Sequence, residues 1–164
     1  MKRRAAPDAH LTRRRIDPAE VVNSVKDERA GGVVLFLGTV RSISEGRSVE
    51  RLEYQAYRVM AERRIREIEA EVRERWPVQK VKILHREGSL AVGEISVAVA
   101  VSSEHREEAF EACRYAIGTV KHSLPVWKRE KIVGGGELWV EGEPIREART
   151  RASPSRESAR KQVA

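Results

Sequence analysis

Residues 94–102 constrain the fold more than any other segment, because they alternate without interruption. Every second residue is Ile or Val, and the residues between them are all small: Ser96, Ala98, Ala100 and Ser102. A period of two is typical of a β-strand with two distinct faces. The face of small residues would let a helix pack closely on the strand, and we expect that helix to be the one that follows in the sequence.

The other patterned segments predict three helices and five more strands. Asp17, Pro18 and Glu20 are typical of a helix start, and Gly31 and Gly32 are expected to end this first helix. Two longer helices are expected at residues 59–76 and 105–121, and strands at residues 33–37, 49–57, 81–84, 126–133 and 138–140.

The order of these elements indicates the fold class. Strands come in adjacent pairs and do not strictly alternate with helices, which predicts a single α+β domain with a largely antiparallel sheet. The continuous apolar run at residues 33–37 favours a strand that is buried on both faces. The last long helix has an apolar stripe that runs through Phe110, Cys113, Ile117 and Val120.

Basic residues concentrate near both ends of the chain. The 164 residues carry a formal net charge of +7, which invites a hypothesis of nucleic-acid binding. However, residues 1–15 have a net charge of +5 and residues 146–164 a net charge of +4, so the stretch between them is slightly acidic. We therefore predict a basic N-terminal arm at residues 1–15, a folded domain at residues 16–143 and a basic, disordered tail at residues 144–164. A basic nucleic-acid-binding module is the alternative function, and the acidic middle makes nucleic acid an unlikely partner.

Several classes of protein are excluded by what the sequence lacks. The single cysteine, Cys113, cannot form an internal disulfide, and its apolar stripe predicts a buried core thiol.

No apolar run reaches the roughly 18 residues that span a bilayer, and the N-terminus lacks the apolar core of a secretory signal. We expect a cytoplasmic protein without a membrane partner. The four histidines show no spacing typical of a metal site and no nucleotide-binding glycine motif is present, so neither a metal nor a cofactor is expected.

The candidates for chemistry are cations at the ends of predicted elements. Arg41 comes just after the strand at residues 33–37. His105 and Arg106 open a helix, where free backbone N–H groups and the helix dipole favour an anion. Guanidinium and imidazole donors in such places would bind a phosphate or a carboxylate.

Two lysines flank a proline in the next block of the sequence. Lys121 ends the long helix and Lys128 follows seven residues later, beyond Pro125, so the two ammonium groups could converge. Trp127 would supply an apolar wall that lowers a lysine pKa by desolvation, and a neutral lysine can act as a base or a nucleophile. Lys121 could equally complement the end of its own helix, and Lys128 could be a surface lysine on an edge strand.

Together, several segments resemble the large, catalytic subunit of molybdopterin synthase, the MoaE family. They are residues 31–41, 52–57 with Met60 and Ala61, 90–94, 102–106 with Ala109 and Phe110, and 121–130, where the block Pro125-Val126-Trp127-Lys128-Arg129-Glu130 follows Lys121. The resemblance covers about residues 16–140 in order. The ordered set is specific, whereas each segment alone is a weak signal.

The resemblance implies an α/β-hammerhead-like α+β fold and a sulfurtransferase of molybdenum-cofactor biosynthesis. It implies a homodimer within a heterotetramer, with a small ubiquitin-like sulfur-carrier subunit at each end. The carrier's C-terminal Gly-Gly thiocarboxylate would enter the active site. Its sulfur would pass in two rounds to cyclic pyranopterin monophosphate and give the dithiolene of molybdopterin. A subunit kept for assembly only is a further alternative.

The resemblance also implies roles for individual residues. Lys121 and Lys128 would be catalytic, and the substrate-binding residues would be Thr39, Val40, Arg41, His105, Arg106, Lys121, Lys128, Arg129 and Glu130. Two positions depart from the family pattern, since Gln55 and Gly118 stand where acidic residues are common. A glycine inside a helix costs roughly 1 kcal/mol relative to alanine, so Gly118 would loosen the helix end that positions Lys121.

Overall fold

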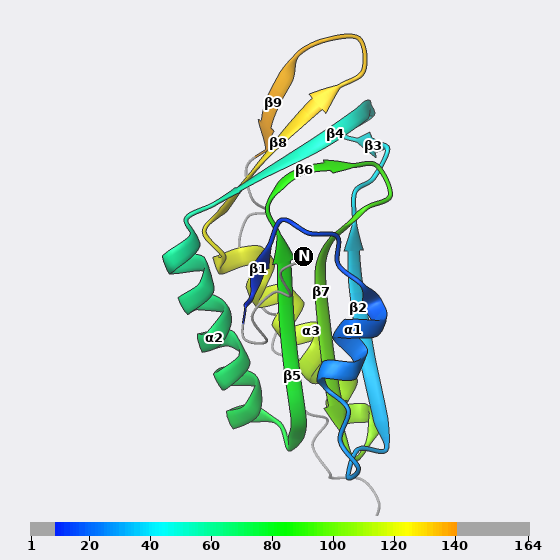
Figure 1. The fold of residues 1–164 in the computed structure, drawn as a ribbon, viewed down its shortest axis with the longest axis vertical. Coiled ribbons are helices and arrows are strands. Elements are labelled where there is room, and N and C mark those ends of the chain that lie inside the picture. The colour runs from blue at the N-terminus through cyan, green and yellow to red at the C-terminus, as the bar shows by residue number, and fades with distance from the viewer. Residues whose placement is uncertain (1–8, 141–164) are drawn as a thin grey trace, which may run out of the picture.

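The first sheet is built around β7 (Ile95–Ser103), the strand that the alternating segment predicts. A computed structural model describes residues 9–140 of the chain. In it, β7 pairs antiparallel with β2 (Gly32–Thr39) on one side and with β5 (Val78–Arg86) on the other. The short β1 (Leu11–Thr12) extends this sheet parallel to β5, which gives the order β1-β5-β7-β2 (Figure 1). The predicted tail at residues 144–164 lies outside the described residues.

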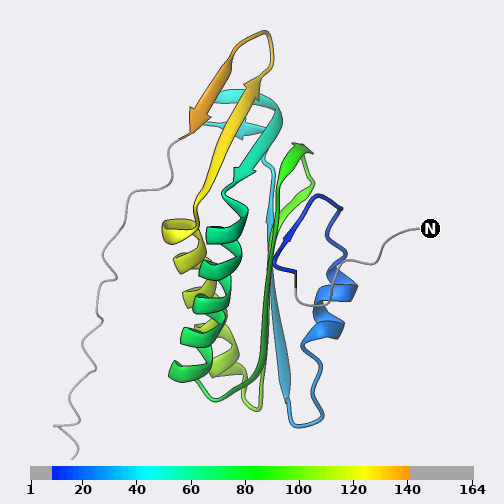
Figure 2. The ribbon, with the colours of Figure 1, turned by 60° about the vertical axis from the view of Figure 1, so that its left-hand side comes forward.

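Helices cover both faces of this sheet. The long helices α2 (Arg58–Arg75) and α3 (Arg106–Ser123) lie side by side on one face, and the short α1 (Pro18–Ser24) lies on the other (Figure 2). The bounds of α2 and α3 agree with the predicted helices to within two residues. None of the helices in residues 9–140 is long and apolar enough to cross a membrane.

The two faces of β7 pack against different helices, and the expected pairing of small residues with the next helix is wrong. The valines of β7 face α2 and α3, while Ala98 and Ala100 form a second core cluster with Val21 and Val25 of the α1 region. The reason is that α3 brings its own small residues to the valines: Ala109, Ala112 and Ala116. A close approach needs small side chains on only one of the two surfaces.

This packing also corrects the predicted apolar stripe of α3. Phe110 is 63% exposed, whereas Ala109 and Cys113 are buried. The buried face is therefore turned toward the alanines, and the bulky Phe110 side chain stands outside the core. Hydrophobicity alone ranks Phe110 above alanine, but the close contact with β7 selects the smaller residues.

The strand β2 is packed on both faces but is only half-buried. Val34 and Phe36 contact the cluster under α3, and Leu35 and Leu37 contact the cluster under α1. Because β2 is the edge strand of the sheet, its side chains lose the cover that a further strand would give, so the strand that is expected to be buried on both faces is packed on both but only partly buried.

The second sheet lies at one end of the first (Figure 1). It consists of β3 (Ile43–Ser44), β4 (Arg47–Ala56), β6 (Gly88–Ala91), β8 (Val126–Ile132) and β9 (Glu137–Val140), all paired antiparallel. A cluster of Val40, Leu52 and Leu90, with Tyr54 against it, joins this sheet to the end of β2. The domain therefore has helices on both faces of one sheet and a second, antiparallel sheet beside it. This arrangement confirms the predicted α+β class in a single domain.

Short elements account for most of the differences from the predicted order. β1, β3 and β6 have two to four residues and no predicted counterpart. The first helix ends at Ser24, before the predicted glycine stop. Beyond it, the Asp27 carboxylate accepts a hydrogen bond from the Arg29 backbone N–H at 3.0 Å, a local turn that competes with the helix.

Residues 9–15 are packed against the domain, although the sequence predicts that they belong to a basic arm. Leu11 is only 2% exposed, and Glu62 of α2 accepts hydrogen bonds from the backbone N–H groups of His10 and Leu11. An apolar side chain with a strand partner therefore ties this segment down despite the arginines that follow it. The folded part begins before residue 16.

Gly31 provides a test of how closely β2 approaches the start of α3. A Cβ at Gly31 would lie 2.3 Å from the backbone oxygen of Glu104. We expect Gly31→Ala to lower the free energy of unfolding by about 1–3 kcal/mol, because backbone must move to admit the methyl group. Gly32→Ala is the matched control, since no atom lies within 4 Å of its Cβ position. Urea denaturation of both variants measures the difference, and equal stability of the two would contradict the close approach.

Candidate active site

Lys128 and Glu130 share one face of β8. Their cross-strand partners on β4 are Tyr54 and Leu52, and directly paired residues project from the same side of a sheet. Both charged side chains therefore stand on the side where Val40 packs. Lys128 Nζ lies 3.4 Å from Glu130 Oε1, and Glu130 is only 5% exposed. This buried carboxylate fixes the position of the Lys128 ammonium group.

Sequence reasoning did not single out Tyr54, which lies opposite Lys128, or His85, which contacts Tyr54, as site residues. The Tyr54 ring meets the His85 ring edge-on, with 5.1 Å between centroids. Burial raises the pKa of Tyr54, and the negative charge of Glu130 raises it further, against a hydrogen bond with Ser96 that lowers it. Burial lowers the pKa of His85, so its ring is neutral at pH 7. Only the strand register, which the sequence does not reveal, brings Tyr54 opposite Lys128, and His85 contacts the far side of this pair through the Tyr54 ring.

Val40 anchors Arg41 at the junction of the two sheets. The Val40 N–H donates to Glu94 O at 3.0 Å, and its carbonyl accepts from the Gly93 N–H at 2.8 Å. Val40 is 3% exposed and both of its backbone polar groups are hydrogen-bonded, so it holds the chain in place just before Arg41. Thr39 ends β2 and pairs with Ile95, and the next exposed side chain is that of Arg41.

Lys121 and Lys128 lie on either side of one turn. Lys121 is exposed in the last turn of α3, and the chain reverses at Leu124 and Pro125 before it enters β8. Pro125 O accepts a hydrogen bond from the Tyr57 N–H at 3.2 Å, which ties the turn to the start of α2. The two lysines therefore border the same end of the helical layer.

The predicted apolar wall at Lys128 is wrong. Residues 126–132 form a continuous strand, so Trp127 projects from the face opposite Lys128, pairs with Gln55 and is 54% exposed. The environment of Lys128 comes from Tyr54 and Glu130 instead.

Arg129 also projects away from Lys128 and Glu130. Its guanidinium binds Glu53 across the sheet and Glu137 of β9, the latter at 2.8 Å, and it lies 5.4 Å from the Trp139 ring centroid. The hydrogen bond from Arg129 lowers the pKa of Glu53. The structure therefore does not bring Arg129 together with the other two members of its block.

His105 and Arg106 lie at the far end of α3 from Lys121. An 18-residue helix is about 27 Å long at 1.5 Å per residue. Both side chains are exposed, and His105 Nε2 lies 3.8 Å from a carboxylate oxygen of the neighbouring Glu104. Within one chain, these two cations and the lysines cannot contact the same small molecule.

The remaining positions raised by the sequence have structural roles. Cys113 is 4% exposed and burial raises the pKa of its thiol to about 11, which confirms a core thiol. Gly118 lies inside α3, which continues without a break to Ser123. Among residues 9–140, no group of three or more His, Cys, Asp or Glu side chains is placed to hold a metal ion.

Comparisons with known proteins agree on one family. The family model described as "MoaE protein" matches residues 11–123. The chain is 49% identical over 123 residues to the molybdopterin synthase catalytic subunit of Nostoc sp., covering 74% of each chain. It is 45% identical over 124 residues to that of Pyrococcus abyssi, covering 76% of this chain and 83% of the relative.

Solved structures show the same likeness. The structure of molybdopterin synthase from Staphylococcus aureus matches with a TM-score of 0.78 and 36% identity, over 82% of this chain and 97% of that one. A complex of subunits 1 and 2 of the molybdopterin-converting factor from Helicobacter pylori matches with a TM-score of 0.65 over 88% of this chain and 92% of that one. At 20% identity, the second likeness concerns the fold alone.

Proposed function

The chain belongs to the MoaE family of molybdopterin synthase catalytic subunits, and from this premise we propose that it transfers sulfur to cyclic pyranopterin monophosphate. The donor is the C-terminal Gly-Gly thiocarboxylate of a small, ubiquitin-like carrier subunit. Two rounds of transfer give the dithiolene of molybdopterin. The observation that carries the proposal is the placement of Lys121 and Lys128 on either side of one turn. We place the reaction in the cytoplasm.

Each cation near the turn has a role that follows from its position. Lys121 is exposed and would meet the anionic thiocarboxylate. Lys128 is held by Glu130 at 3.4 Å, so its ammonium group has a fixed direction. Arg41, at the junction of the sheets, would bind the phosphate of the substrate, for which a guanidinium offers two parallel donors. Glu130 and Val40 are positioning residues.

The carrier would dock around the turn. Large apolar side chains are exposed there: Tyr57 (58%), Val59 (78%), Met60 (56%) and Trp127 (54%). A cluster of exposed apolar residues is typical of a surface that binds another protein. The related complex of two subunits from Helicobacter pylori supports a small-subunit partner. A tail that crosses this surface would bring its last residue to the lysines.

His105, Arg106 and Arg129 need a different explanation. Exposed apolar residues flank the first two, namely Phe110 (63%) on α3 and Val33 (40%) on the edge strand β2. We propose that a second copy of the chain covers this surface and that His105 and Arg106 complete the substrate site of the partner. Arg129, held between Glu53 and Glu137, would stabilise the wall of the site from behind without contacting the substrate.

Mixing two inactive variants tests this arrangement together with the activity. Lys121→Ala and His105→Ala homodimers should each be defective in molybdopterin formation from the pterin substrate and a thiocarboxylated carrier. After subunit exchange, we expect about a quarter of the parent activity, because roughly half of the dimers are mixed and each mixed dimer has one intact site. A carrier that ends in an ordinary carboxylate is the control.

The outcomes separate the two parts of the proposal. If exchange is verified by mass and activity does not recover, His105 acts within its own chain or not at all, and the shared site is wrong. If the parent chain forms no molybdopterin with a carrier that supports a known synthase, the proposed activity itself is wrong.

A further inference from the structure

Tyr54 lies where the two sheets meet and connects the surroundings of two candidate groups, Lys128 and Arg41. On β4 it stands directly opposite Lys128 of β8. Its side chain also packs against the cluster that contains Val40, the residue before Arg41. Lys128 belongs to the second sheet, whereas Arg41 follows the edge strand of the first. The contacts of Tyr54 therefore bear on how these two groups are placed relative to each other.

The Tyr54 ring rests on the His85 ring. The centroids of the two rings are 5.1 Å apart, and the ring planes make an angle of 82°. An edge-to-face contact of this kind stabilises an aromatic pair beyond the area that it buries. Because His85 lies on β5 of the first sheet, the contact fixes the end of β4 against the other sheet.

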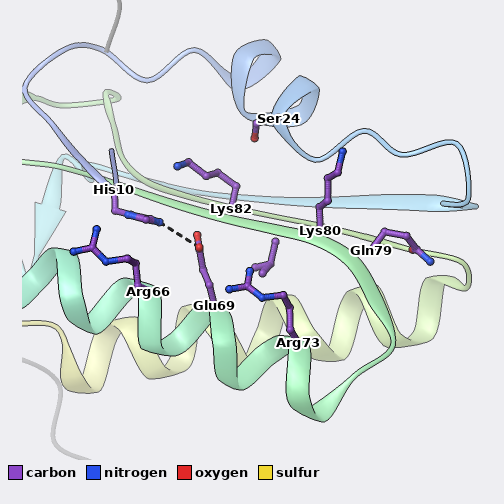
Figure 3. Close-up of a pocket in the computed structure, with 9 residues that line it drawn as sticks. His10, Ser24, Arg66, Glu69, Arg73, Gln79, Lys80 and Lys82 are labelled. Atoms are coloured by element: carbon purple, nitrogen blue, oxygen red, sulfur yellow. Dashed lines mark hydrogen bonds and ion pairs between the residues drawn. The ribbon is translucent and has the colours of Figure 1, made fainter. Parts of the chain in front are cut away.

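His85 is itself held in place. Its backbone N–H donates to His10 O at 2.8 Å, and the His10 Nε2 atom lies 3.2 Å from Glu69 Oε2 of α2 (Figure 3). Within the His85 ring, Nδ1 lies 2.7 Å from the backbone oxygen of Arg86. A carbonyl oxygen can only accept, so Nδ1 carries the proton of the neutral ring. The buried His85 ring is therefore a fixed support for Tyr54.

The Tyr54 hydroxyl is bonded to the first sheet as well. It forms a hydrogen bond with Ser96. Ser96 is buried, and its Oγ donates to Gly38 O at 3.2 Å. Since a serine hydroxyl has one hydrogen, Ser96 accepts the hydrogen bond that Tyr54 donates. Gly38 lies in β2 shortly before Arg41, so a chain of hydrogen bonds runs from Tyr54 to the end of β2 that carries Arg41.

The Lys128 side chain occupies a confined space beside Tyr54. It is 28% exposed, and its ammonium group lies 3.4 Å from Glu130. Directly opposite residues on antiparallel strands have Cβ atoms about 5 Å apart, so the Tyr54 ring and the Lys128 methylene groups are neighbours. Glu130 fixes the charged end of this side chain, and the Tyr54 ring limits the positions that its stem can take.

We propose that Tyr54 is a positioning residue for sulfur transfer, which holds Lys128 at a fixed place relative to Arg41. The ring forms one wall of the space that the Lys128 side chain occupies. The hydroxyl ties this wall to β2 through Ser96. Tyr54 acts through Lys128 and does not contact the substrate. The inference rests on the proposed function, because Lys128 and Arg41 belong to the site proposed for that reaction.

Tyr54→Phe tests the proposal, since it keeps the ring and removes only the hydroxyl. In molybdopterin formation from a thiocarboxylated carrier and the pterin substrate, we expect kcat to fall by about ten-fold, because small misplacements of a reacting group are costly. The KM for the pterin should stay within about two-fold of the parent, because Arg41 still binds the phosphate. Ser96→Ala should give the same loss. The double variant should lose no more than either single variant, because both break the same link.

Tyr115→Phe is the matched control. It removes a phenol hydroxyl that donates to Glu71 Oε2 at 2.6 Å between α3 and α2, and its kcat should stay within about two-fold of the parent. A parent-like kcat in Tyr54→Phe, or an equal loss in Tyr115→Phe, would overturn the proposal. A raised KM with unchanged kcat in Tyr54→Phe would also overturn it, since the hydroxyl would then bind the substrate.

NMR of the chain with ¹³C-labelled lysine tests the position of Lys128 without the reaction. The Lys128 Cε signal, assigned by its absence in Lys128→Arg, should shift in Tyr54→Phe and Ser96→Ala but not in Tyr115→Phe. If the parent chain forms no molybdopterin, the proposed function is wrong, yet a shifted signal would still support the link between Tyr54 and Lys128. An unchanged signal in Tyr54→Phe would overturn that link whatever the activity of the parent.

Discussion

Lys121→Ala is expected to lower the rate of molybdopterin formation by at least about 100-fold, the usual contribution of a group that transfers protons or attacks the reacting atom. Lys121 is exposed in the last turn of α3, and no ion pair or hydrogen bond of its side chain is seen within residues 9–140. Alanine is also the best helix former. The free energy of unfolding should therefore change by less than about 0.5 kcal/mol, and the loss would be one of chemistry.

Two further variants make this prediction specific. Lys131→Ala removes an ammonium group from β8 that pairs with Glu50 at 3.3 Å, and it should retain most of the parent rate. Lys121→Arg keeps the charge but cannot become neutral at any accessible pH. Single-turnover measurement with a saturating carrier separates the cases. A parent-like rate in Lys121→Ala would remove this residue from the active site, and a parent-like rate in Lys121→Arg would leave it only an anion-binding role.

The long elements could be predicted because their patterns are strong. The alternation of residues 94–102 and the apolar spacing along α2 and α3 identify these elements within a few residues. The pairing of their surfaces could not, because it depends on side-chain size on both partners. Ala109 and Ala116 let α3 approach the valines of β7, and no local pattern distinguishes that surface from the stripe through Phe110.

The candidate site shows the same limit. The block that contains Lys128, Arg129 and Glu130 could be located from the sequence, but which side chains lie near it on each face depends on the pairing of β8 with β4. That register is a long-range property, set by Tyr54 and Leu52 far away in the chain. The sequence could also place His105 and Lys121 at the two ends of one helix, and their assignment to different pockets is our proposal.

Leu90→Ala is expected to have the largest effect on stability among the substitutions near the site. Leu90 is fully buried and pairs with Leu52 in the cluster that joins the second sheet to the end of β2. Removing a buried leucine side chain costs about 2–5 kcal/mol, because burial is lost and a cavity remains. The cost should be toward the upper end if Val40 and Leu52 cannot move inward. Urea denaturation measures this loss of stability, provided that the free energy of unfolding falls with urea concentration at the same rate in both proteins.

The same cavity should weaken catalysis through geometry. Val40 fixes Arg41, and Leu52 lies on the face of the sheet that carries Glu130, so a looser cluster would let Arg41 and Lys128 move relative to each other. We expect a lower kcat together with a higher KM at a temperature where the variant is still folded. Ile43→Ala is the control, since Ile43 is 59% exposed in the same sheet. Loss of stability with unchanged kinetics would show that the cluster holds the fold together without positioning the site. A loss of less than about 1 kcal/mol in the free energy of unfolding would show that the cluster can collapse around the smaller side chain.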